Sequence, residues 1–191
     1  MLEKRCVFLG QYHRWDDRND KRYLEKYKSE KGLKTLLVCC FSGKRETFHH
    51  WKVFASKGVC IEFRKNKLIS SLEGVKGVHH KKVRYHHVEY GQAEGGWSVR
   101  QLPFLKRRVY VDEAEYRFIY ENKTSQESVK ELPLDLNCIK KINLSPWLPD
   151  AEVQKAIKKI HGIKGCENLN VLPSTVLENS DWVKLLDSLR A

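Results

Sequence analysis

The chain has 191 residues, of which 41% are hydrophobic and 10% aromatic, a composition that supports a globular protein with a sizeable core. No apolar run is long enough to span a membrane, and residues 6–9 are too short an apolar stretch for a signal peptide. We therefore expect a cytoplasmic protein with no membrane partner. The length predicts a single domain over residues 1–191, with 150–191 as a C-terminal helix-strand-helix extension of the same core.

The first half of the chain alternates helical and strand-like patterns. A short charged helix over 17–31 is closed by Gly32, since glycine readily takes the left-handed conformation found at helix ends. The spacing of apolar residues then predicts, in order, a buried strand over 35–41, a helix over 46–55, a strand over 59–63, a helical turn over 68–72 and a half-buried strand over 81–90.

The second half contains more strands. Residues 91–96 form a Gly-rich stretch that we expect to be a loop or a flap over a site. The patterns after it predict strands over 114–120, 132–136 and 139–144, an amphipathic helix from Asp150 to Gly162, a strand over 169–172 and a helix over 181–189. Strands and helices do not alternate regularly, so we expect an α+β fold with a mainly antiparallel, strand-rich core flanked by short helices.

Positive charge is the clearest functional signal in the composition. Lys and Arg number 36 against 24 Asp and Glu, and residues 44–87 hold eleven Lys and Arg against three Glu. Such a stretch either forms a solvated basic face or binds nucleic acid or another phosphate-bearing ligand. The candidate nucleic-acid contacts are Lys44, Arg45, Arg64, Lys65, Lys81, Lys82 and Arg84.

Metal binding is not expected from the cysteine and histidine patterns. The six cysteines include no C-x-x-C pair, the spacing that structural zinc sites favour. The three His-His pairs would project to opposite faces if they lie on strands. Cys39, Cys40 and Cys60 lie in apolar runs, where a reduced thiol behaves as a small hydrophobic side chain.

The sharpest candidate for chemistry is Glu115. On a strand over 114–120, Glu113, Glu115 and Arg117 would share one face, close to the basic run of Lys106 and Arg107. A carboxylate held between basic groups stays ionised and can orient a ribose, accept a proton or hold a cation. The alternative is an ion-pair ladder in which Glu115 only pairs with Arg117 or Lys106.

Two further candidates come from the region between residues 46 and 63. Glu62 lies among apolar residues, so we expect it to be buried and to need a basic partner, either as a structural ion pair or at a polar site. His50 could act as an acid or base near neutral pH, although a histidine on a helix is more often structural. Trp51 is either a core residue or a stacking platform. An acidic patch at 16–20 fits helix capping by Asp16 or Asp17 better than a calcium loop.

Several short segments, in this order and spacing, resemble a bacterial family of unknown function, DUF2971. They are Trp15-Asp16-Asp17 with Asn19-Asp20, Cys40-Phe41-Ser42, His50-Trp51 with Phe54-Ala55, residues 58–63, Phe104-Leu105-Lys106-Arg107 with Glu113, Glu115 and Arg117, and Leu144-Ser145-Pro146-Trp147. Because that family is frequent in prophages, mobile elements and antiphage loci, the resemblance implies a defence or toxin-like role.

The strand-rich core with a late glutamate is also similar to the ADP-ribosyltransferases. On that similarity NAD is a possible substrate and Glu115 is the catalytic glutamate that holds the ribose of NAD. The cofactor-binding residues it implies are Lys106, Arg107 and Arg117 beside the glutamate, with Ser42 or Trp51 lining the nicotinamide pocket.

Two classes of function stay open at this point. The first is an enzyme acting on nucleic acid or nucleotide, with ADP-ribosyl transfer or NAD cleavage ahead of nuclease chemistry. The second is a non-catalytic module that senses or binds nucleic acid, or that docks a partner protein or antitoxin. The motifs of P-loop, dinucleotide-binding, serine-hydrolase and zinc-protease enzymes do not occur in the sequence.

Overall fold

In the computed structural model, which describes residues 1–87 and 96–188, the chain divides into two units. The first unit is made of the described residues within 5–44 and 69–134, together with Met1. The second is made of those within 45–68 and 135–191, together with residues 2–4.

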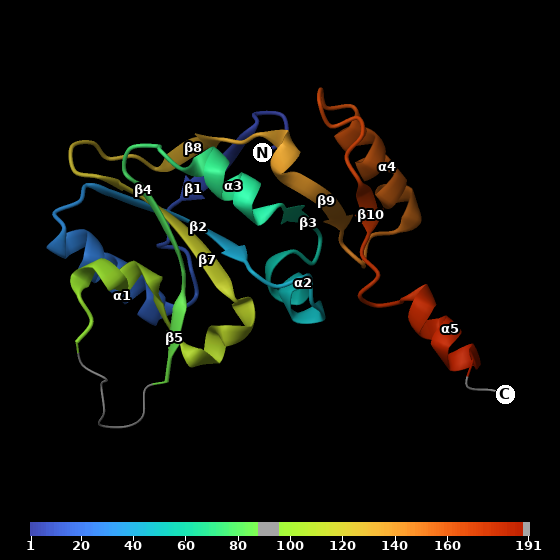
Figure 1. Cartoon of the computed structure of the whole chain (residues 1–191), viewed down its shortest axis with the longest axis horizontal. Helices are drawn as coiled ribbons and strands as arrows, with labels where there is room; N and C mark the ends of the chain where they lie inside the picture. Colours follow the sequence, from blue (N-terminus) through green and yellow to red (C-terminus); the bar gives the residue numbers. More distant parts are fainter. Residues whose placement is uncertain (88–95, 189–191) are drawn as a thin grey trace. The chain divides into compact units, whose positions relative to one another are not determined.

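The first unit is built on a five-stranded antiparallel sheet with the strand order β4-β7-β2-β1-β8 (Figure 1). Its two longest strands, β2 and β7, pair along their whole length from Thr35↔Asn122 to Ser42↔Glu115. Every residue of β7 therefore has a partner on β2, and this fixes which β7 side chains share a face. The strands are β1 (Cys6–Gly10), β2 (Thr35–Ser42), β4 (Val78–Lys82), β7 (Glu115–Asn122) and β8 (Val129–Pro133).

Helix α1 (Arg18–Glu30) covers one face of this sheet. The side chain of Asp17 caps its N-terminus by accepting hydrogen bonds from the backbone N–H groups of Asn19 and Asp20. Asp20, Leu24 and Tyr27 are the buried positions of the helix, at the i, i+4, i+7 spacing of one helical face. Leu24 and Tyr27 belong to an apolar cluster whose other members are Tyr12, Leu33, Leu36, Val38, Phe104 and Ile119.

A second, two-stranded sheet in the same unit leads from the edge of the main sheet to the candidate site. It pairs β5 (Arg84–His86) in parallel with β6 (Leu105–Arg107). Two 3-10 helices flank β6, η1 (Val99–Phe104) before it and η2 (Arg108–Glu113) after it. Ala114 ends η2 in the left-handed conformation, at φ 44°, and the chain then enters β7.

The second unit has a three-stranded sheet in the order β10-β9-β3, formed by β3 (Val59–Phe63), β9 (Ile139–Leu144) and β10 (Val171–Pro173). Its helices are α2 (Phe48–Phe54), the short η3 (Leu136–Cys138), α4 (Asp150–His161) and α5 (Ser180–Ser188). Helix α3 (Lys65–Leu72) has its first four residues in this unit and its last four in the first unit.

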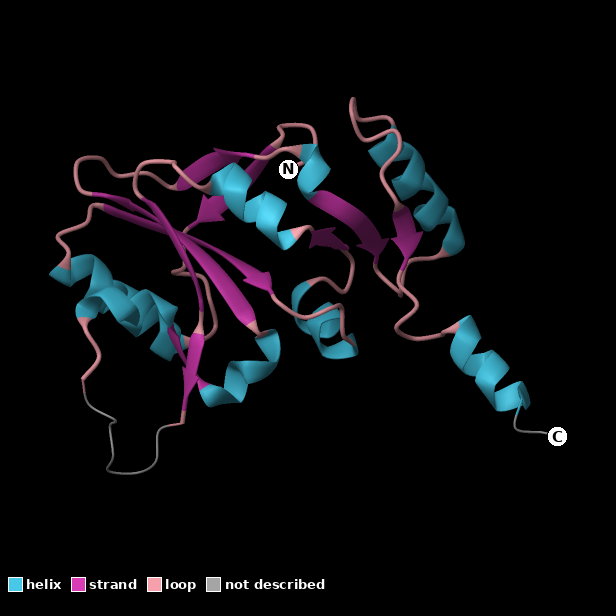
Figure 2. Cartoon of the chain, viewed as in Figure 1, coloured by secondary structure: helices cyan, strands magenta, loops and turns pink. Residues whose placement is uncertain are grey.

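The fold class predicted from the sequence is confirmed: the chain is α+β with a mainly antiparallel sheet (Figure 2). The strand predicted over 81–90 is wrong in its extent. It is divided into β4 and β5 at Val83, whose buried N–H donates to the carbonyl of Glu115, while residues 88–90 lie outside the described chain. The predicted loop at 91–96 also lies outside it except for Gly96.

Four further strands have ends that differ from the predictions by one to three residues. Strand β2 ends at Ser42 where 35–41 was predicted, β7 spans 115–122 where 114–120 was predicted, β8 spans 129–133 where 132–136 was predicted, and β10 spans 171–173 where 169–172 was predicted. Among the helices of residues 1–87 and 96–188, none combines the length and the apolar character needed to cross a membrane.

Candidate functional site

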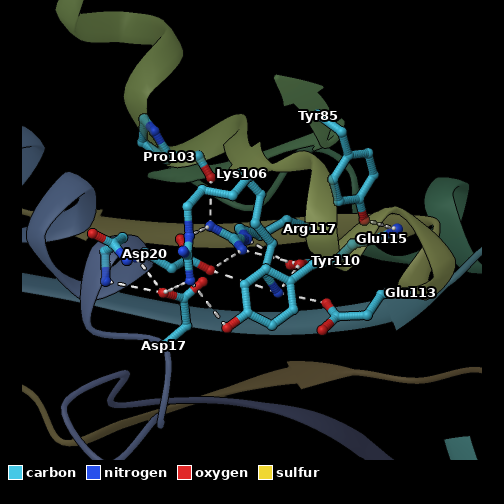
Figure 3. Close-up of polar contacts among 11 residues, drawn as sticks. Asp17, Asp20, Tyr85, Pro103, Lys106, Tyr110, Glu113, Glu115 and Arg117 are labelled. Carbon is cyan, nitrogen blue, oxygen red and sulfur yellow. Dashed lines mark hydrogen bonds and ion pairs between the residues drawn. The ribbon is translucent and has the colours of Figure 1, made fainter. Parts of the chain in front are cut away.

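The buried guanidinium of Arg117 is the centre of a charged cluster in the first unit (Figure 3). Its side chain is 0% exposed. Nε donates to Glu115 Oε1 at 2.6 Å and Nη2 to Glu115 Oε2 at 3.0 Å. Toward α1, Nη1 and Nη2 donate to the two carboxylate oxygens of Asp20 at 2.9 and 2.6 Å, and Nη1 also donates to the carbonyl of Pro103 at 2.8 Å. These bonds use all five N–H donors of the guanidinium group.

Lys106, from β6, supplies the second cation of this cluster. Its Nζ lies 2.5 Å from Glu113 Oε2, 3.2 Å from Glu115 Oε2 and 3.8 Å from Asp20 Oδ2. Burial by itself lowers the pKa of Lys106, but the charges of Glu115, Glu113 and Asp20 raise it overall, so the amine stays protonated. The ammonium group of Lys106 therefore lies close to three carboxylates and reduces the repulsion between them.

The two acidic partners of Arg117 respond differently to burial. For Glu115, burial favours the neutral acid, but hydrogen bonds and charge from Arg117, together with the charge of Lys106, outweigh it and lower the pKa. For Asp20, burial is the dominant effect and the pKa is raised despite the same guanidinium. Glu115 is thus the firmly ionised member of the cluster, and its two oxygens already accept three hydrogen bonds from Arg117 and Lys106.

An open pocket of about 350 Å³ adjoins this cluster. Asp17 lines it, with a side chain that is 8% exposed. Its Oδ1 caps α1 and lies 3.6 Å from Nη2 of Arg107, whereas its Oδ2 is buried and has no hydrogen-bond donor among the described residues. The lining consists of Asp17, Asn19, Asp20, Tyr23, His86, Trp97, Leu105, Lys106 and Arg107.

The pocket combines one exposed cation with aromatic rings. Arg107 is 46% exposed, and its guanidinium carbon lies 5.4 Å from the ring of Tyr110. The rings of His86 and Trp97 lie 4.6 Å apart, and Tyr23 also lines the pocket. Such a lining offers stacking surfaces, a phosphate-binding group and a carboxylate acceptor within one small volume.

The structure brings four predicted site residues together: Glu115, Arg117, Lys106 and Arg107 all lie at or beside the pocket. The expected shared strand face is correct for Glu115 and Arg117 but wrong for Glu113. That residue ends η2, because the left-handed turn at Ala114 separates it from β7. It reaches the cluster only through Lys106.

Ser42 lies opposite Glu115 in the strand register, but its hydroxyl donates to the carbonyl of Glu113 at 2.8 Å and accepts from the backbone N–H of Lys44. The hydroxyl therefore holds the turn at the end of β2.

Three other candidates belong to the second unit. Trp51 is 2% exposed and its Nε1 donates to Glu46 Oε2 at 2.8 Å, so it is a core residue with no free ring face for stacking. His50 is a half-buried residue of α2 whose backbone N–H is bound by the cap residue Thr47.

The expectation that Glu62 is buried is wrong. Its side chain is 29% exposed, because β3 is an edge strand of its sheet. The predicted basic partner is present: Lys140 lies 2.6 Å from one carboxylate oxygen and Lys141 3.6 Å from the other, and the hydrogen bond from Lys140 is the main cause of a lowered pKa.

The predicted nucleic-acid contacts are exposed, but two of them have structural partners. Lys44 forms an ion pair with Asp112 at 3.0 Å, and Arg64 donates to the backbone carbonyls of Asn137 and Ile139. In the first unit the exposed cations Lys81, Lys82 and Arg84 follow one another along β4 and β5; Arg45 and Lys65 are exposed in the second unit.

Asp20 was expected only as part of the acidic patch at 16–20, and its pairing with Arg117 was not predicted. A signal for its burial exists, because its spacing from Leu24 and Tyr27 places a carboxylate on the apolar face of α1. Sequence reasoning missed Tyr85, whose hydroxyl accepts from the backbone N–H of Glu115 at 2.8 Å, and the lining residue Trp97. No group of His, Cys, Asp and Glu side chains suited to a metal ion occurs within residues 1–87 and 96–188.

Comparisons of this chain with protein-family models, with curated proteins and with solved structures gave no match.

Replacing Arg117 with Gln leaves Asp20 and Glu115 buried without their main counter-charge, so we expect a loss of about 3–5 kcal/mol in unfolding free energy. Arg117→Lys keeps the positive charge but not the five N–H donors, so it should lower the free energy of unfolding by less than Arg117→Gln does. The matched control is Arg108→Gln at an exposed position, which should change stability by no more than about 0.5 kcal/mol. Urea unfolding followed by circular dichroism measures these differences; equal stability of Arg117→Gln and Arg108→Gln would contradict the structural role.

The lowered pKa of Glu115 also sets a pH dependence. A carboxylate whose pKa is lowered on folding stabilises the protein above its unfolded pKa, near 4.5, and that stability is lost as the pH falls through the folded value. The stability advantage of the wild type over Glu115→Gln should therefore be full at neutral pH and shrink below about pH 4.5. Unfolding curves of both proteins, recorded from neutral pH to below pH 4.5, test this dependence. A stability advantage of the wild type that grows on acidification would contradict a lowered pKa of Glu115.

Proposed function

We propose that the chain binds a nucleotide in the pocket beside the Arg117 cluster and acts on it as a defence- or toxin-associated enzyme, with ADP-ribosyl transfer or NAD cleavage as its reaction. The observation that carries the proposal is the pairing of Asp17, which has a carboxylate oxygen without a donor among the described residues, with the exposed guanidinium of Arg107 in one pocket. The association with defence rests on the resemblance to DUF2971. None of the six cysteines forms a disulfide bond, which suits the cytoplasm that we propose as its location.

The groups of a nucleotide fit the chemistry of the lining. A buried carboxylate oxygen without a donor costs about 1–3 kcal/mol, and a ribose hydroxyl would supply that donor to Asp17. Arg107 can bind phosphate oxygens with two N–H groups at once. Trp97 and Tyr23 offer aromatic surface to a base or a nicotinamide ring.

The size of the pocket limits what it can enclose. The volume of about 350 Å³ includes space that is open to solvent, so the pocket encloses only part of a ligand. The lining would contact one part of a dinucleotide such as NAD, and the rest would lie in solvent.

The reaction needs negative charge beside the sugar. When the bond between ribose C1′ and the nicotinamide nitrogen breaks, the electron pair leaves with nicotinamide and positive charge develops on the ribose. Asp17 would stabilise that charge, and water or an acceptor hydroxyl would then add to C1′ and lose a proton. The oxygens of Glu115 already bind Arg117 and Lys106, so we assign Glu115 the role of a positioning residue that holds Lys106 at the pocket wall.

One observation favours the second candidate, a nucleic-acid-binding module. The exposed cations Lys81, Lys82 and Arg84 lie in sequence along β4 and β5, an arrangement that suits successive phosphates of a polymer. On this alternative the protein binds nucleic acid in a salt-dependent manner and consumes nothing.

The test compares Asp17→Asn with Asp16→Asn. Asparagine caps a helix about as well as aspartate, so Asp17→Asn should fold normally while its amide N–H₂ replaces the acceptor oxygen. We expect it to lower NAD or ADP-ribose affinity and nicotinamide release about tenfold or more, since a charged hydrogen bond of about 1.5–3 kcal/mol is lost. Asp16, an exposed neighbour, should tolerate the same change.

Calorimetric titration and chromatographic detection of nicotinamide measure both quantities. Nicotinamide release that Asp17→Asn leaves unchanged would contradict the assigned role. Heat stabilisation by single-stranded DNA alone, with no NAD turnover, would favour the binding module.

A further inference from the structure

A second set of reactive side chains lies on the face of the five-stranded sheet opposite the Arg117 cluster. In the β4–β7 pairing, His80 lies across from Phe118, two residues along β7 from Tyr116, and Glu73 precedes β4. The hydroxyl of Tyr116 lies 2.8 Å from Nδ1 of His80, and Nε2 of the same ring lies 3.4 Å from Glu73 Oε1. The three side chains form a line of phenol, imidazole and carboxylate.

The neighbours of His80 favour one arrangement of its ring protons. A carboxylate cannot donate a hydrogen bond, so the arrangement that suits both neighbours has the proton on Nε2, 3.4 Å from Glu73 Oε1. Nδ1 is then an acceptor and Tyr116 the donor. The ring is held in this orientation by stacking on Phe118, with centroids 4.9 Å apart. This is the arrangement in which a histidine takes a proton from a hydroxyl nucleophile while a carboxylate stabilises the resulting imidazolium.

Solvent reaches the imidazole and the carboxylate of this set. The side chain of His80 is 21% exposed and that of Glu73 is 55% exposed, while Phe118 beneath them is buried. Burial, and then the charge of Glu73, raise the pKa of Tyr116, so the phenol keeps its proton until a base removes it. His80 is therefore fixed by its stacking on buried Phe118, while His80 and Glu73 remain partly exposed to solvent.

The neighbouring cations indicate the substrate. Lys82 is exposed and directly opposite Tyr116 in the β4–β7 register, a position whose side chains lie within about 5 Å of each other at their Cβ atoms. Lys81 is also exposed on β4 but lies opposite Arg117 in the register, and Arg84 is exposed on β5 of the two-stranded sheet. Lys82 is therefore the cation on the face of Tyr116, where it can bind a phosphate oxygen, while Lys81 and Arg84 can bind neighbouring phosphates of a polymer that passes over the edge strand β4.

We propose that Tyr116 is a nucleophile that attacks a phosphodiester of single-stranded nucleic acid, with His80 as its general base and Glu73 as the residue that positions and stabilises His80. The Oη–phosphorus bond forms as the bond from phosphorus to one sugar oxygen breaks. The phenol proton passes to His80 Nδ1 and from there to the departing sugar oxygen. The products are one strand with a free hydroxyl end and one strand joined to Tyr116 through a phosphotyrosyl ester. This inference is independent of the nucleotide pocket, which lies on the other face of the sheet.

The experiment incubates the full chain with single-stranded DNA or RNA oligonucleotides labelled at one end or the other, with and without Mg²⁺, and separates the products on a denaturing gel. We expect a covalent protein–oligonucleotide band carrying only one of the two labels, and mass spectrometry should place the adduct on Tyr116. Tyr116→Phe should abolish the band, and His80→Gln should slow its formation about 10²-fold or more, the usual contribution of a general base. Glu73→Gln should have a smaller effect.

The matched control is Tyr120→Phe, which also removes a hydrogen-bonded hydroxyl from the same strand and the same face but should leave the adduct unchanged. Mapping the adduct in the wild-type protein keeps the test valid even where a variant folds poorly. No adduct with any oligonucleotide, or an adduct at another residue, would overturn the proposal. Label transferred from ATP or NAD but not from oligonucleotides would overturn the assignment of nucleic acid as the substrate.

Discussion

A fully buried guanidinium needs an acceptor for every one of its N–H groups, and this requirement organises the first unit. Arg117 obtains its acceptors from three separate segments: Asp20 in α1, Pro103 at the end of η1, and Glu115 at the start of its own strand. Asp20 and Arg117 are 97 positions apart in the sequence. The ion pair therefore joins the helix to the sheet through two directional hydrogen bonds.

The candidate pocket is a consequence of this constraint. Lys106 is drawn to the carboxylates around Arg117, and the next residue along β6, Arg107, then reaches the cap residue Asp17 at the start of α1. The pocket wall is thus made of side chains held by charge pairing, and it includes Asp17 and Arg107, which we propose as the ligand contacts. Glu115, the candidate catalytic residue of the sequence, and Arg117, which the resemblance implied as a cofactor-binding residue, lie behind this wall and do not line the pocket. Tyr116 projects from the opposite face of β7 and contacts His80 of β4, and neither residue takes part in the Arg117 cluster.

The sequence predicted what depends on local spacing. Helix α1, strands β2 and β9, helix α4 and the α+β class follow from apolar periodicity, and the pairing of Glu115 with Arg117 follows from the two-residue period of a strand. Errors arose where sheet position decides burial. Residues 59–63 have the apolar pattern of an inner strand, but β3 is at the edge of a small sheet, which leaves Glu62 partly in solvent.

Contacts between distant segments could not be read from any local pattern. The left-handed conformation of Ala114 removes Glu113 from the strand, although alanine rarely adopts it. The contact of His80 with Tyr116 depends on the register of β4 against β7, and the pocket depends on the parallel pairing of β5 with β6. Neither the contact nor the pocket can be predicted before the pairing of these strands is known.

Nuclear magnetic resonance of the arginine side chains in uniformly ¹⁵N-labelled protein measures the burial of Arg117 directly. A guanidinium with all five N–H groups bound cannot rotate freely about its Nε–Cζ bond and is shielded from exchange with water. We expect separate, slowly exchanging N–H signals for Arg117, and for exposed Arg108 the averaged, rapidly exchanging signals of a side chain in solvent. Averaged and rapidly exchanging signals for Arg117 as well would contradict the buried cluster on which the pocket depends.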